Sequence, residues 1–478
     1  MIRQVSSYLL ANIVSAMLGF ASVVIFTRLL GPSEYGIYII GFSIAAMISA
    51  LLFGWIKSSV VPLTAHDQGA DLRVTTGLAF VGMVPLVPVL YFGISAFAPQ
   101  YAAYLLPAIL LAYGIGFFEF YLEVFRAKQQ TGPYLWATVI RAAAALALSL
   151  LLIMVFGLGG VGLLLSVMAS YFITSSIFAA ILWRGPLKPL DPALLKAMLV
   201  FGVPMTVSGA VFVLQTMLDR FVIAGTMGEH SAGIYGASAD LVRQIILFPG
   251  VAIGTAVAPI AVQLLARNER AELDRHLVDS TELLLGVLAP AVAGLAIVSA
   301  KLVFIVLGEE FRLEAARLIP LIALAWLLRS FSYQLLHVSF QIRKTPGLML
   351  LQGVAILAIN ALALFILVPR FGLMGAASAL IISEAAGVVI GYLLTRRAYP
   401  LPLDPRPFLK VGLATLGMAV PTVLVDRALP GMSVLDIGLP VVVGMLTYGL
   451  CAYALDVAGI RSRLKTLRMR AASLPVGQ

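Results

Sequence analysis

Gly31-Pro-Ser-Glu-Tyr-Gly-Ile-Tyr38 recurs in altered form as Gly228-Glu-His-Ser-Ala-Gly-Ile-Tyr235, with the first residue and the closing Gly-Ile-Tyr unchanged. Each copy stands in front of a long apolar run, so we expect each to be a turn that precedes a helix. A motif that returns about two hundred residues later indicates that the chain contains two related units.

Further matches follow the motif in the same order in both halves. The linker Pro189-Leu-Asp-Pro192 returns as Pro402-Leu-Asp-Pro405, and in each copy the pattern predicts Asp as the helix N-cap with Pro at the first helical position. Phe156-Gly-Leu-Gly-Gly160 returns as Phe371-Gly-Leu-Met-Gly375. The constant order of these matches favours a duplicated unit over chance similarity.

The composition places the chain in a membrane. Hydrophobic residues make up 61% of the 478 residues and charged residues only 11%, against about 45–50% and 25% in soluble domains. The apolar residues come in runs of about twenty, the length that spans a bilayer as helix. One cysteine excludes an internal disulfide, and four histidines give no metal-ligand cluster. The net charge of +10 is scattered between apolar runs, which argues against nucleic-acid binding.

These runs predict an all-α polytopic membrane protein with about fourteen transmembrane helices. Residues 1–184 form an N-terminal six-helix lobe, residues 185–400 a C-terminal six-helix lobe, and residues 401–478 two additional transmembrane helices and a basic cytoplasmic tail. The predicted spans are 6–28, 36–60, 75–96, 102–125, 134–156, 161–182, 198–223, 234–264, 280–300, 315–340, 347–369, 373–395, 408–428 and 434–457.

Because six is an even number, the two lobes are parallel repeats, related by an axis along the membrane normal and arranged around a central cleft. We therefore expect Gly36-Ile-Tyr38 to superpose on Gly233-Ile-Tyr235. Most of the 32 Lys and Arg residues fall in the connections on the side that holds both termini, and basic connections face the cytoplasm. The sequence thus predicts that both termini are cytoplasmic.

Two segments around the repeated motif resemble a known family. Thr27-Arg-Leu-Leu-Gly-Pro-Ser-Glu-Tyr-Gly-Ile-Tyr38, together with Leu218-Asp-Arg-Phe-Val-Ile-Ala-Gly-Thr-Met-Gly228 and the following Gly233-Ile-Tyr235, is similar to the polysaccharide biosynthesis flippases of the multidrug/oligosaccharidyl-lipid/polysaccharide (MOP) superfamily. The resemblance implies alternating-access movement of a polyprenyl-pyrophosphate-linked oligosaccharide from the cytoplasmic to the periplasmic leaflet. It also implies a bacterial inner (cytoplasmic) membrane, surface polysaccharide assembly and polysaccharide polymerase machinery as a partner.

Three alternatives stay open. The two additional helices are similar to the lipid II flippase branch, so a lipid II-type flippase is the first. A MATE-like drug/cation antiporter shares the superfamily fold, but we expect it to favour acidic side chains in the cleft, whereas this chain has arginines within its spans. A membrane glycan ligase or polymerase is less favoured, because the sequence has no sizeable external loop. No Walker motif is present, and we expect neither an enzyme nor a cofactor.

Five basic residues are the candidates for contact with the anionic head group. Arginine matches phosphate with two parallel hydrogen bonds and keeps its charge when desolvated. Arg243 and Arg329 are the leading substrate-binding candidates, followed by Arg28, Lys57 and Arg141.

Acidic residues within the spans are candidates for ion coupling. Asp219, Asp240 and Glu384 can bind a proton or Na⁺, because an intramembrane carboxylate needs a partner or a watery cavity. Asp240 and Arg243 stand one helical turn apart and form the leading functional pair.

Two other predicted ion pairs leave their role open between a structural latch and a substrate site. One joins Glu119 to Arg141, and the second joins Arg329 to Glu384. For His337 the sequence favours a hydrogen-bonded position inside the helix bundle over a proton relay.

Overall fold

The computed structural model describes residues 2–66, 71–185, 187–402 and 404–461, and every regular element in these ranges is a helix. Ten of the helices in this part of the chain are long and apolar enough to cross a membrane. The predicted all-α polytopic membrane fold is therefore confirmed. By packing, the chain divides into two compact units, residues 1–237 with 364–376 and residues 238–363 with 377–478. The predicted lobe boundaries at residues 184 and 400 stay a prediction.

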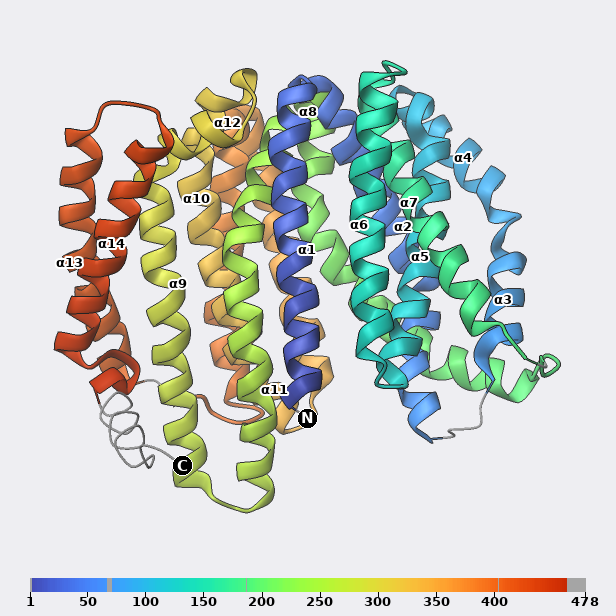
Figure 1. Ribbon diagram of the computed structural model, residues 1–478. Coiled ribbons are helices and arrows are strands. Elements are labelled where there is room, and N and C mark those ends of the chain that lie inside the picture. Colours follow the sequence, from blue (N-terminus) through green and yellow to red (C-terminus); the bar gives the residue numbers. More distant parts are fainter. Residues whose placement is uncertain (1, 67–70, 186, 403, 462–478) are drawn as a thin grey trace, which may run out of the picture. The chain divides into compact units, whose positions relative to one another are not determined.

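The first unit contains seven described helices, the first part of an eighth and residues 364–376 of α12. Helix α2 packs on α5 and α7, and α1 lies along α6 (Figure 1). Aromatic rings join α2, α3 and α5, because Phe80 stacks on Phe53 at 4.8 Å and on Phe117 at 4.0 Å. The helices are α1 (Ile2–Leu29), α2 (Pro32–His66), α3 (Leu72–Met83), α4 (Leu86–Phe97), α5 (Ala102–Ala127), α6 (Thr131–Met154), α7 (Gly159–Leu182) and the start of α8 (Pro192–Ala266), with a short 3₁₀ turn at Pro99–Tyr101.

The second unit holds the rest of α8 and the remaining helices, apart from residues 364–376 of α12, which belong to the first unit. α10 packs on α9, while α13 and α14 pack against each other and against α9 (Figure 1). Val411 and Ala414 of α13 and Ala452 of α14 form a buried apolar cluster that also contacts Leu285 of α9. The helices are α9 (Arg270–Val306), α10 (Arg312–Phe331), α11 (His337–Ile342), α12 (Pro346–Thr395), α13 (Pro405–Ala428) and α14 (Val434–Leu455), with short turns at Glu309–Phe311 and Val457–Gly459.

Two of the long helices each correspond to two predicted spans. Helix α8 is interrupted at Gly228, with φ 82° and ψ 180°, and α12 at Gly372, with φ 56° and ψ −135°. Glycine adopts positive φ without the clash that a Cβ would cause, so the chain can reverse direction within a single residue. The predicted third span is α3 followed by α4, and the tenth is α10 continued through a π-helical segment, Ser332–Leu336, into α11.

Most of the repeated motif is helical. The prediction of a turn over the whole motif was therefore wrong, because the turn is shorter than the motif. Helix α2 already begins at Pro32, and helical geometry resumes directly after Gly228. Proline suits the first helical position because its fixed φ is helical and its missing N–H has no partner there. Both linker N-caps are confirmed, since Asp191 accepts from Ala193 N at 2.9 Å and Asp404 from Arg406 N at 2.9 Å.

The two copies of the motif contact each other reciprocally within the first unit. A Cβ on Gly36 would lie 1.9 Å from the carbonyl oxygen of Glu229, and a Cβ on Gly233 would lie 2.0 Å from that of Pro32. Gly36 corresponds to Gly233 in the repeat, and Pro32 corresponds to Glu229. Contacts that repeat with the partners exchanged are those of a local two-fold axis. The superposition of whole lobes stays a prediction.

Candidate functional site

Lys57 and Glu119 form an ion pair inside the first unit. Nζ of Lys57 on α2 lies 3.1 Å from Oε1 of Glu119 on α5, and the two side chains are 45% and 37% exposed. The predicted partner of Glu119, Arg141, was wrong. Helices α2 and α5 pack against each other, and this packing places Lys57 of α2, and not Arg141 of α6, beside Glu119.

Arg141 faces aromatic rings. Its guanidinium carbon lies 4.9 Å from the ring centre of Tyr171 on α7 and 5.6 Å from that of Phe118 on α5. A cation above an aromatic face is attracted to the ring quadrupole. These ring contacts stabilise the charge of Arg141 within its predicted span without an ion pair to Glu119. Its guanidinium N–H groups are therefore not used in such a pair.

Asp219 is bonded to the repeated motif. The hydroxyl of Tyr235, the last residue of the second copy, donates to Oδ2 of Asp219 over 2.8 Å, and both side chains are buried. The bond joins the two segments of α8 across the break at Gly228, so this carboxylate stabilises the reversal of the chain.

Asp240 and Arg243 form the predicted pair on α8 in the second unit. Nη2 of Arg243 lies 3.5 Å from Oδ1 of Asp240, and the arginine side chain is 35% exposed. The long distance and the partial exposure leave this guanidinium able to meet a second anion. Arg28, in the last turn of α1, is also exposed.

Arg329 and Glu384 form a buried ion pair between α10 and α12. Nη2 and Nε of Arg329 donate to Oε1 of Glu384 at 2.7 and 2.8 Å, and the carboxylate side chain is fully buried. The guanidinium also lies 5.2 Å from the Trp326 ring centre. The predicted pairing is confirmed, whereas its substrate role stays a prediction.

A polar network lies along the π-helical segment, which begins three residues after Arg329. Gln352 on α12 donates to Oγ of Ser332 at 3.1 Å and to the carbonyl of Gly387 at 2.8 Å, and its Oε1 lies 3.2 Å from Nε2 of His337. His337 is therefore a buried, hydrogen-bonded bundle residue, as predicted. Segments of π-helix often occur at functional sites, which marks this region as a second candidate.

Two contacts of the repeated motif could not be found by pattern alone. Tyr104 of α5 donates to Oε1 of Glu229 at 2.8 Å, and Oε2 of Glu34 accepts from the backbone N–H of Gly160 at 2.5 Å. Gly160 lies in the first turn of α7, where N–H groups lack intrahelical partners, so a carboxylate is stabilised there. Within the described ranges no group of three His, Cys, Asp or Glu side chains is placed to hold a metal ion.

The long apolar helices and the charges paired within them define a polytopic membrane protein. Over 94% of this chain and 98% of the other, the fold is similar to an inward closed structure of the lipid II flippase MurJ, with a TM-score of 0.75 and 16% identity. An inward-facing multidrug resistance MATE transporter of the MOP superfamily matches 80% of this chain and 94% of its own, with a TM-score of 0.65 and 15% identity.

The family described as polysaccharide biosynthesis protein matches residues 1–265, and the chain belongs to this family. It is 22% identical over 398 residues to Agl15 of Haloferax volcanii, whose name assigns it to flipping in low-salt glycan biosynthesis; the match covers 80% of each chain. It is 24% identical over 204 residues to a Shigella flexneri protein whose name assigns it to O-antigen transport. That match spans 43% of this chain and only 47% of the relative.

Proposed function

We propose that this protein is a flippase that moves a polyprenyl-pyrophosphate-linked oligosaccharide from the cytoplasmic to the periplasmic leaflet of a bacterial inner membrane. The observation that carries the proposal is the family match over residues 1–265, the segment that also contains both copies of the repeated motif. The names of the two relatives, O-antigen transport and glycan flipping, support the same substrate class. Movement of a lipid across the bilayer needs no covalent step, so the protein is proposed not to be an enzyme.

The accessible cations support an anionic head group. The Arg243 side chain is 35% exposed, and its distance to Asp240, 3.5 Å, is long for an ion pair. Arg243 is therefore the leading phosphate contact. Lys57, Arg141 and Arg28 are further contacts. Arg329 can reach a phosphate only if the phosphate takes the place of Glu384, because a buried charge without a partner is strongly disfavoured.

A lipid II-type flippase is the second candidate. The similarity to the lipid II flippase fold extends over more of this chain than the similarity to the MATE transporter, which favours a lipid-linked substrate over a drug. Asp219, Asp240 and Glu384 are the proposed sites for proton or Na⁺ coupling. We further propose that both termini lie in the cytoplasm. The proposed partner is polysaccharide polymerase machinery.

Replacement of Arg243 tests the proposal in cells that depend on this protein for surface glycan. Arg243→Ala should abolish glycan export while the protein stays in the membrane, and Arg243→Lys should restore it partly, since an ammonium loses the two-bond geometry of guanidinium. Arg397→Ala is the matched control, because Arg397 is exposed and follows the end of α12. Unchanged surface glycan in the Arg243→Ala strain would contradict the assignment.

A further inference from the structure

A pocket of about 370 Å³ lies within the first unit where α2, α5 and α7 end and α3 begins. Its lining combines aromatic and aliphatic side chains with four cations and one carboxylate. The lining residues are Thr64, Asp71, Leu72, Arg73, Phe120, Tyr121, Val124, Lys128, Leu182, Trp183, Arg184 and Lys188.

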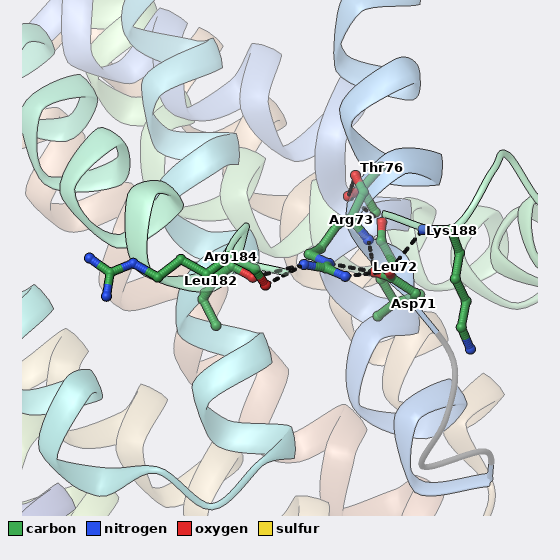
Figure 2. Close-up of polar contacts among 7 residues, drawn as sticks. All are labelled: Asp71, Leu72, Arg73, Thr76, Leu182, Arg184 and Lys188. Carbon is green, nitrogen blue, oxygen red and sulfur yellow. Dashed lines mark hydrogen bonds and ion pairs between the residues drawn. The ribbon is translucent and has the colours of Figure 1, made fainter. Parts of the chain in front are cut away.

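The carboxylate, Asp71, and one of the cations, Arg73, form an ion pair with each other. Nε and Nη2 of Arg73 donate to the two oxygens of Asp71 at 2.8 and 2.7 Å, and Nη1 donates to the carbonyls of Leu182 and Arg184 at 3.4 and 3.1 Å (Figure 2). These bonds hold the start of α3 against the end of α7. The hydrogen bond from Arg73 lowers the pKa of Asp71 to about 2, so the carboxylate stays charged and neutralises Arg73.

The other three cations give the pocket a net positive charge. Lys128 follows the end of α5, and Arg184 and Lys188 follow the end of α7; all three side chains are exposed. Figure 2 shows the heads of Arg184 and Lys188 on opposite sides of the Asp71–Arg73 pair, each pointing away from it. This cationic rim therefore acts through its positive potential, which raises the local concentration of anions, and not as a set of donors that converge on one atom.

The remaining wall is apolar and well supported. Nε1 of Trp183 donates to the hydroxyl of Tyr121 at 3.2 Å, which fixes the indole ring in the lining. Gly77 of α3 permits this position, because a Cβ there would lie 2.8 Å from the ring. Tryptophan and tyrosine with one apolar and one polar side are typical of the membrane–water interface. A cationic rim above an apolar wall fits an amphiphile with a phosphate head.

We propose that this pocket binds an anionic lipid with a phosphate head group, which is attracted by the positive charge of Lys128, Arg184 and Lys188, while the adjoining chain lies against Trp183. A free phosphate would leave the apolar wall unused. The lipid is either a bilayer phospholipid or the polyprenyl-pyrophosphate of the proposed substrate, which carry the same chemistry. The proposal needs only that the chain lies in a membrane, so it can fail independently of the proposed flippase activity.

Native mass spectrometry of the full-length protein, released from phosphatidylcholine nanodiscs with increasing phosphatidylglycerol, tests the proposal. The variant Lys128→Ala/Arg184→Ala/Lys188→Ala should retain phosphatidylglycerol about a hundredfold less well, since each basic residue near an anionic lipid contributes about fivefold. The matched control Arg267→Ala/Arg270→Ala/Arg397→Ala removes three exposed cations of the second unit and should retain the lipid as the wild type does. Equal retention by all three proteins would overturn the proposal.

Competition identifies the source of the phosphate. If undecaprenyl pyrophosphate displaces phosphatidylglycerol from the wild type, the pocket serves the substrate; if it does not, the pocket holds a resident phospholipid. Full displacement by inorganic pyrophosphate at equal concentration would overturn the lipid assignment. Trp183→Ala, which leaves the three cations in place, should weaken retention of phosphatidylglycerol and leave inorganic pyrophosphate binding unchanged. Undiminished lipid retention by a folded Trp183→Ala protein would also contradict it.

Discussion

Ser33 and His230 occupy equivalent positions in the two copies of the repeated motif, and they meet each other, with 3.5 Å between Oγ and Nδ1. A residue that contacts its own counterpart lies on the two-fold axis that relates the copies. On either side of this pair, Gly36 packs against Glu229 and Gly233 packs against Pro32. The contact is therefore a symmetric meeting of α2 with the second segment of α8.

A cross-link at this pair should block transport. With Ser33→Cys/His230→Cys in a Cys451→Ser background, mild oxidation should join the two motifs and stop glycan export, and a reductant should restore it, because alternating access requires contacts at one end of the repeats to separate. Cys451 is the only native cysteine, so the background leaves no competing thiol. Gel mobility after cleavage between the cysteines measures cross-linking. A fully cross-linked protein that still exports glycan would show that this contact stays closed throughout the cycle.

Neither Gly36 nor Gly233, the two glycines at the contact between the copies of the motif, should tolerate a side chain. Gly36→Ala should destabilise the protein by about 1–3 kcal/mol, because its Cβ would lie 1.9 Å from a backbone oxygen that cannot move aside cheaply. Gly225→Ala on α8 is the matched control, since nothing lies within 4 Å of a Cβ at that position. Thermal unfolding in detergent should give a lower Tm for the first variant and an unchanged or higher Tm for the second. Equal melting temperatures would refute the close packing.

Two variants distinguish the contribution of the buried Arg329–Glu384 pair to stability from its contribution to transport. Glu384→Gln should destabilise the protein by about 3–5 kcal/mol, because it leaves a buried guanidinium without its countercharge. Arg329→Met/Glu384→Leu should recover most of the stability, since apolar residues of similar volume often replace such a pair at little cost. If Arg329 contacts substrate, this stable double variant should not export glycan. Export by the double variant would assign the pair a structural role alone.

The Asp71–Arg73 pair predicts an acid-dependent loss of stability. Because the pKa of Asp71 in the folded protein, about 2, lies below its ordinary value of 3.8, the stabilisation is complete above about pH 5 and is lost as the pH falls through 3.8 towards 2. Asp71→Asn should lower the Tm at pH 7 and leave it unchanged at pH 2. Melting curves of the two proteins between these pH values provide the measurement; a constant difference across the range would contradict the assigned pKa.

An inside-negative membrane potential should drive transport without an ion gradient. Outward movement of an anionic head group is favoured by roughly 2.3 kcal/mol per charge per 100 mV. On the return stroke, inward movement of Arg243 and its neighbours is favoured by the same field. In proteoliposomes, a potential alone should support net transport of the lipid-linked substrate. If transport stays at background until a pH or Na⁺ gradient is imposed, Asp219, Asp240 and Glu384 become the coupling candidates.

The helices could be predicted from the sequence because a bilayer fixes the length of an apolar run, and even the reversals at Gly228 and Gly372 carry a local signal. Contacts between helices have no such signal. Glu119 is one helical turn from Glu123 on any helix, but its bond to Lys57 depends on which side of α5 faces α2. The pocket beside Trp183 has no sequence signal for the same reason, since Phe120 and Trp183 come together only when α5 and α7 pack.

The asymmetry of the Ser33–His230 contact bears on the ancestry of the chain. In a dimer of identical subunits, a residue on the two-fold axis always opposes a copy of itself, so serine would face serine and histidine would face histidine. One mutation in the shared gene would then change both sides at once. Joining the two copies in a single polypeptide removes this constraint, so the two positions can diverge, and serine opposite histidine shows that they have done so.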